Sequence, residues 1–220
     1  MLPTLTPLLD RFAERAPIAT MARASLEHCL KAEFLDDWFD QVSETQYTRK
    51  LMFSTVFDLM SQVVFRHQLS IHLAHQASAQ EIGVTVQAVY DKLKGLEPGT
   101  SRALVGHVAS QAGALISELG AQKPLLAGYQ VKILDGNVLG AREHRLAETR
   151  GTSAAPLPGK SLAVLDPALG QIMDMIPCED AYTQERALLG AVLETVKAGE
   201  LWIADRNFCT ADFLWGLSER

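Results

Sequence analysis

Apolar residues in the first 120 positions recur at spacings of three and four, and strict alternation of apolar and polar residues is scarce there. This spacing is the period of one face of an α-helix. Two stripes are clear, at residues 52–63 and 104–119. Thr100 or Ser101 is a candidate N-cap for the second stripe, and Gly120 follows it, as glycine often follows a helix end. The pattern predicts a helical first part whose stripes form a packed core.

The pattern changes near residue 123. Lys123, Pro124 and Gly128 interrupt the helical period, and short apolar runs separated by turns follow. These runs predict strands, which we place at residues 129–136, 160–167, 171–177 and 201–205. The second and third runs are joined by a turn over residues 166–170, which predicts a hairpin.

A helical stripe over residues 181–198, with Gly199 just beyond it, separates the hairpin from the last strand. Thr210 is a candidate cap for one more helix. The order of elements predicts a mixed α+β or α/β chain. We expect an all-helical domain over residues 1–123, followed over residues 124–220 by a domain with a mixed sheet and helices.

Residues 70–95 fit a helix-turn-helix unit. Ala79, Gly83 and Val89 stand at offsets of four and six, where such a unit has a small residue, a turn glycine and a buried aliphatic residue. Thr85 is placed to cap the second helix of the unit.

Two outward residues of that second helix are candidates for DNA contact. Gln87 carries an amide that can read a base edge, and Lys94 carries a charge that can meet a phosphate. A small helical domain with a glycine turn fits the same residues, so both interpretations stay open.

Charge and composition narrow the classes of protein. The formal net charge is −6 at pH 7, which opposes DNA binding because neutralising phosphates normally needs clustered Lys and Arg. Acidic active sites add negative charge of their own, so the charge alone does not decide. The three cysteines form no CxxC pair, which supports neither a disulfide framework nor a zinc knuckle. The chain shows no secretion signal and no span apolar enough for a bilayer, so we expect a cytoplasmic protein without membrane contact.

Two aspartates end apolar strand runs. Asp135 closes ILD and Asp205 closes WIAD, positions where a polar side chain is exposed at the edge of a sheet. If the two strands are neighbours, the carboxylates can share a divalent metal, and Mg²⁺ suits such oxygen ligands. In two-metal phosphoryl transfer, one ion activates a water or a DNA 3′-hydroxyl and the other stabilises the leaving oxygen. Turn chemistry or helix capping also explains an aspartate at a strand end. We interpret Asp166, in the hairpin turn, and Asp174 as structural.

Four segments together resemble insertion-sequence transposases of the IS-four type: ILDGNVLGAREHRLAETR (133–150), PLPGKSLAVLDP (156–167), TQERALL (183–189) and LWIADRNFCT (201–210). The resemblance implies a ribonuclease-H-like catalytic core with Asp135 and Asp205 as its first and second catalytic aspartates. It implies Mg²⁺ or Mn²⁺ as cofactor and metal-dependent DNA strand cleavage and transfer during DNA transposition. Double-stranded DNA, at element ends and target, is the implied partner, and a homodimer is left open.

The sequence departs from the family pattern in two places. The family's third carboxylate is a glutamate on a helix well beyond the second aspartate, in a tyrosine, arginine, glutamate signature, and the sequence stops at Arg220 before it. Asn137 stands where the family often has a small hydroxyl residue. We therefore expect an incomplete core and little catalysis by this chain alone. Glu185 is not expected to replace the missing glutamate, because its helix precedes the strand of the second aspartate.

Basic residues near the motifs are candidates for phosphate contact, since Arg offers bidentate geometry for phosphates. The candidates are Arg142, Arg145, Lys160 and Arg206. Surface ion pairs are the alternative for each. The rival interpretation of the whole chain is a non-enzymatic helix-turn-helix protein that binds DNA, or an inactive remnant.

Overall fold

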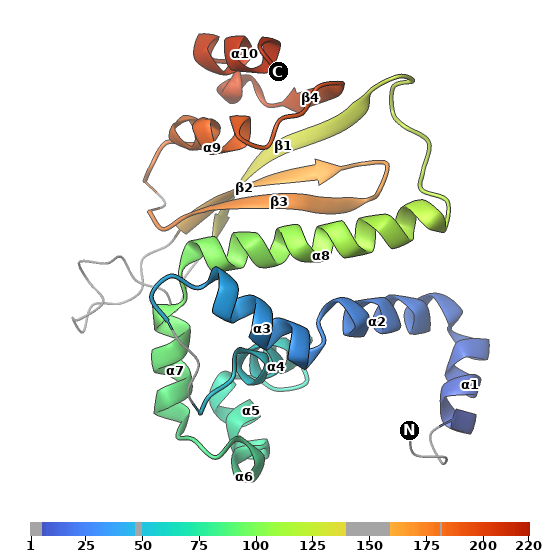
Figure 1. Cartoon of the computed structure of the whole chain (residues 1–220), viewed down its shortest axis with the longest axis vertical. Helices are drawn as coiled ribbons and strands as arrows, with labels where there is room; N and C mark the ends of the chain where they lie inside the picture. The colour runs from blue at the N-terminus through green and yellow to red at the C-terminus, as the bar shows by residue number, and fades with distance from the viewer. Residues whose placement is uncertain (1–5, 47–49, 140–158, 181) are drawn as a thin grey trace.

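Helices make up the first part of the chain, as the apolar stripes predict. The computed structural model describes residues 6–46, 50–139, 159–180 and 182–220 (Figure 1). The helices of the first part are α1 (Thr6–Arg15), α2 (Pro17–Cys29), α3 (Ala32–Val42), α4 (Phe53–Val64), α5 (Ile71–Ala77), α6 (Ala79–Ile82), α7 (Val86–Gly95) and α8 (Pro98–Glu118). The apolar stripe over 52–63 lies on α4, where Val56 and Leu59 are buried.

The long helix α8 begins earlier than its sequence predicts. Glu97 is its N-cap residue and Pro98 its first residue, so Thr100 and Ser101 lie inside the helix. Proline suits that position because its fixed φ fits a helix and its missing N–H is not needed there. The side chain of Thr100 instead donates a hydrogen bond back to the Glu97 carboxylate, at 3.1 Å. Gly120 follows the end of the helix with φ +92°.

A four-stranded mixed sheet follows the helices, as the strand predictions require. Its strands are β1 (Gln130–Leu139), β2 (Gly159–Asp166), β3 (Gln171–Cys178) and β4 (Glu200–Ala204). Their order in the sheet is β3-β2-β1-β4. β2 pairs antiparallel with both β1 and β3, whereas β4 pairs parallel with β1. The predicted hairpin between β2 and β3 is therefore confirmed.

Short helical segments connect β3 to β4 and follow β4. They are η2 (Glu185–Leu188), α9 (Leu189–Leu193), η3 (Arg206–Phe208) and α10 (Ala211–Ser218). The predicted helix over 181–198 is thus much shorter than its apolar stripe. Thr210 caps α10, as predicted, because its hydroxyl accepts the Phe213 N–H at 3.3 Å. The core of this part joins the sheet to α9, η3 and α10 through Leu134, Leu162, Val192, Phe208 and Phe213.

Helix α8 lies along β3 and connects the helical part to the sheet (Figure 1). Arg102 of α8 donates two hydrogen bonds to the Asp174 carboxylate of β3, at 3.0 and 2.8 Å, and a third to the Ala191 carbonyl at 3.3 Å. The Gln171 side-chain amide of β3 donates to the Ala109 carbonyl of α8 at 2.9 Å. Asp174 therefore has the structural role expected for it. The domain boundary at residue 123 stays a prediction.

The hairpin turn is held by Asp166, which also has the expected structural role. Its carboxylate accepts a hydrogen bond from the Lys132 ammonium at 2.7 Å and from the backbone N–H groups of Ala168 and Leu169. Burial by itself raises the pKa of Asp166, but the bonds from Lys132 and Leu169 outweigh it and hold that pKa below its usual value.

Candidate functional site

Asp135 lies within β1 and Asp205 directly follows β4, and these two strands are adjacent and parallel. In the register of β1 with β4, the last pair is Leu134 with Ala204, so Asp135 and Asp205 are the next residues along each chain. Because parallel strands run in the same direction, both residues stand at the same level of the sheet. β1 continues to Leu139, beyond the predicted end of its strand, because its pairing with β2 extends further than its pairing with β4.

Each aspartate is exposed and each has one carboxylate oxygen in a local hydrogen bond. Asp135 Oδ1 accepts the Gly136 N–H at 2.8 Å. Asp205 is the N-cap of η3, and its Oδ1 accepts the Asn207 N–H at 2.9 Å. The capping interpretation of Asp205 is therefore correct as a description of its local structure. Capping engages Oδ1 and is compatible with a second role for the same carboxylate.

Glu185 lies against β1 over Gly136, the residue after Asp135, which sequence reasoning did not anticipate. A Cβ added at Gly136 would come within 2.7 Å of Glu185 Cδ, so a residue with a side chain at this position would displace the carboxyl group. The Asn207 side-chain amide donates to Glu185 Oε2 at 3.2 Å. A glycine directly after Asp135 is the signal that could have pointed to such a close approach, because glycine often marks it in a strand.

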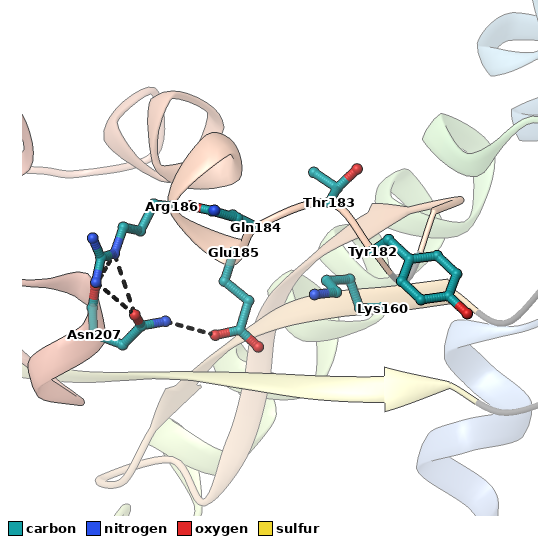
Figure 2. Close-up of a pocket in the computed structure, with 7 residues that line it drawn as sticks. All are labelled: Lys160, Tyr182, Thr183, Gln184, Glu185, Arg186 and Asn207. Carbon is teal, nitrogen blue, oxygen red and sulfur yellow. Dashed lines mark hydrogen bonds between the residues drawn. The ribbon is translucent and has the colours of Figure 1, made fainter.

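Arg186, next to Glu185, binds the two oxygen atoms of Asn207. Its Nε donates to the Asn207 carbonyl at 2.9 Å, and its Nη2 donates to Asn207 Oδ1 at 3.0 Å (Figure 2). The segment before β4 is thereby fixed to the turn after β4. We call Glu185, Arg186 and Asn207 the η2–η3 clamp.

The clamp lines an open polar pocket of about 510 Å³ (Figure 2). Besides the three clamp residues, it is lined by Lys160, Tyr182, Thr183 and Gln184. Lys160 pairs with Val138 in the β1–β2 register. Because Val138 is two positions after Gly136 on β1, Lys160 and Gly136 lie on the same face of the sheet. Of the basic residues proposed for phosphate contact, Lys160 is thus placed in the pocket.

The remaining basic candidates are more scattered. Arg206 is exposed in η3, directly after Asp205. Arg142 and Arg145 lie outside the described residues.

The segment 70–95 folds as helix, turn and helix. Gly83 adopts a left-handed conformation with φ +65°, which glycine tolerates without strain. The Thr85 hydroxyl caps α7 by accepting the Ala88 N–H at 3.3 Å, and Val89 is fully buried, as the pattern predicts. Ala79 differs: it begins the one-turn helix α6 and is exposed, whereas Ala74 of α5 is the fully buried small residue.

The two candidate DNA contacts on α7 are not equally available. Gln87 is exposed, and its amide donates to Asp91 Oδ1 one turn later at 2.8 Å. Lys94 is half-buried near the end of the helix. A base edge would therefore compete with Asp91 for the Gln87 amide.

In the part of the chain that the structure describes, no group of three or more His, Cys, Asp or Glu side chains could hold a metal ion. Cys29, Cys178 and Cys209 are free thiols. Within the same residues, no helix combines the length and apolar character needed to cross a membrane.

Comparisons of the chain with protein-family models, with curated proteins and with solved structures gave no match.

Proposed function

We propose that this chain is a metal-dependent DNA strand-cleaving and strand-joining protein of the transposase type, with a ribonuclease-H-like second part. The observation that carries the proposal is the β1–β4 register, in which Asp135 and Asp205 are the residues that follow the last paired positions of two adjacent parallel strands. The resemblance of the surrounding motifs to IS-four transposases supports the same reaction. Double-stranded DNA is the proposed substrate.

The donor chemistry at the two strands fits Mg²⁺ or Mn²⁺. Both ions prefer oxygen ligands, and Mg²⁺ commonly binds through one or two carboxylates together with substrate phosphates and waters. Two aspartates can therefore contribute ligands to one such ion when a DNA phosphate supplies further oxygens. Bound there, the ion would supply Lewis-acid stabilisation of the phosphate and activation of the attacking hydroxyl.

The surrounding side chains have separate roles in this proposal. Asp135 and Asp205 bind the ion. Arg206, directly after Asp205, meets the phosphates of the DNA and orients the strand. Lys160 lines the pocket on the face of the sheet that carries Gly136, where it can contact a further phosphate. Such contacts are independent of base sequence.

The full chain with Mn²⁺ alone and with a nicked DNA duplex tests the proposal. We expect Mn²⁺ binding, measured by calorimetry, to be lost in Asp135→Ala and in Asp205→Ala. Glu118→Gln is the matched control, because it removes an exposed carboxylate from the end of α8. Strand cleavage or joining, where present, should likewise be lost in the two aspartate variants and kept in Glu118→Gln. Unchanged Mn²⁺ affinity in both aspartate variants would rule the proposal out.

The geometry of segment 70–95 supports a second candidate, a non-enzymatic DNA-binding protein. The left-handed Gly83, the Thr85 cap and the buried Val89 build a turn between two helices. For this function, DNA binding should weaken as salt rises and should weaken in Lys94→Ala, while both aspartate variants bind DNA normally. A gel-shift titration at two salt concentrations separates the two candidates.

A further inference from the structure

Asp205 owes its orientation to the turn that follows it. The Asn207 backbone N–H donates to Asp205 Oδ1, and the Phe208 N–H donates to the Asp205 carbonyl at 2.9 Å. Phe208 is itself buried in the core of the sheet domain. The direction of the Asp205 carboxylate therefore depends on where Asn207 is held.

Asn207 is held by two consecutive residues of another segment. Arg186 engages its backbone carbonyl and its side-chain oxygen, and Glu185 accepts from its side-chain nitrogen (Figure 2). The side-chain oxygen of Asn207 therefore accepts a hydrogen bond and its side-chain nitrogen donates one. An aspartate at this position would lack the donor for Glu185, and an alanine would lack both side-chain contacts.

Glu185 also fixes the clamp against β1. Its carboxyl group lies over Gly136, the residue after Asp135, in space that a Cβ would occupy. The clamp therefore contacts the backbone next to the first aspartate and the turn next to the second. Its three residues connect an inner position of β1 to the turn after β4.

We infer that Glu185, Arg186 and Asn207 are positioning residues that set the Asp205 carboxylate relative to Asp135 for binding of one divalent cation. The inference rests on the proposed function. Glu185 acts here as a hydrogen-bond acceptor and not as a ligand.

The experiment measures Mn²⁺ affinity and thermal unfolding of the full chain in parallel. We expect Asn207→Ala and Glu185→Ala to weaken Mn²⁺ binding about tenfold, the scale on which loss of a supporting contact around metal ligands acts. Glu185→Gln keeps an oxygen that accepts from Asn207, so its affinity should stay within about twofold of the unaltered chain. Glu118→Gln again serves as control.

A further variant guards against a folding defect. Gly136→Ala keeps every clamp residue but displaces the Glu185 carboxyl group, so it should weaken Mn²⁺ binding to a similar degree while the thermal transition remains cooperative. Support requires reduced affinity in Asn207→Ala, Glu185→Ala and Gly136→Ala together with near-normal affinity in Glu185→Gln.

Three outcomes would overturn the inference, and they differ from one another. Equal losses in Glu185→Gln and Glu185→Ala would make Glu185 a metal ligand. Unchanged affinity in all clamp variants, with binding lost in Asp135→Ala and Asp205→Ala, would leave the proposed function standing without the clamp. Affinity unchanged in the two aspartate variants would remove the proposed function and this inference together.

Discussion

Replacing Asp174 with alanine removes both carboxylate oxygens that accept hydrogen bonds from Arg102. The two bonds are 3.0 and 2.8 Å long, and the side chains are only 27% exposed for Arg102 and 15% for Asp174. Breaking a buried pair from one side typically costs about 3–5 kcal/mol, because a charge is left without its partner in a poorly solvated place. Since Arg102 keeps its bond to the Ala191 carbonyl and some contact with solvent, we expect a loss near the lower end, about 3 kcal/mol.

Urea denaturation followed by circular dichroism measures this loss, and thermal unfolding gives a second reading. For a chain of this size about 1 kcal/mol corresponds to roughly 2–4 °C, so the midpoint should fall by roughly 6–12 °C. Glu27→Ala is a matched control. Its pair with Arg23 is equally short at 2.7 Å, but the side chains are 79% and 64% exposed, so the expected loss is at most about 0.5 kcal/mol. If Asp174→Ala cost no more than Glu27→Ala, the packing of α8 against the sheet would not depend on this ion pair.

Three further predictions concern stability. Because the pKa of Asp166 in the folded chain lies below its ordinary value of 3.8, this carboxylate stabilises the fold above that pH and loses its contribution as pH falls through the lower folded pKa; Asp166→Asn should therefore reduce the difference in unfolding free energy measured at about pH 6 and about pH 3. Thr85→Ala removes the cap of α7 and should cost about 1 kcal/mol in urea denaturation, whereas Thr85→Ser should cost much less. Gly83→Ala forces a side chain into the left-handed region at φ +65° and should cost about 1 kcal/mol, although the space around it is open; an unchanged urea midpoint would contradict that reasoning.

The strands were predictable because short apolar runs bounded by turns have few alternatives. The extent of the helix over 181–198 was not predictable. Its apolar residues recur with the helical period, but the chain forms only the short segments η2 and α9 there. Leu189 and Val192 are buried on the one-and-a-half turns of α9, and the chain then turns away and reaches Gly199 at φ +81°. Leu188 of the same stripe packs against this core from the 3-10 helix η2, and periodicity alone does not distinguish that backbone from an α-helix.

The candidate site was predictable only in the part that follows from strand order. Asp135 and Asp205 end apolar runs, and their adjacency required only that β4 pair with β1. Chain order alone argues against Glu185 as a third carboxylate, because Glu185 precedes β4. Its approach to Gly136 spans about 50 residues of sequence and depends on how the η2 segment returns over the sheet; Gly136 indicates that some group approaches β1 closely but not which one.

The packing of α8 against β3 decides which fragment of the chain is suitable for studying the sheet by NMR. A fragment beginning at residue 124 would lack Arg102 and the Ala109 carbonyl, both of which bind β3 in the full chain. It would also expose Ile172 further, because Leu104 and Val108 of α8 line the same apolar pocket. Such a fragment would be prone to self-association in solution, because its apolar surface is exposed. A start at Glu97, which retains the whole of α8 together with its N-cap, is the more promising boundary for expression.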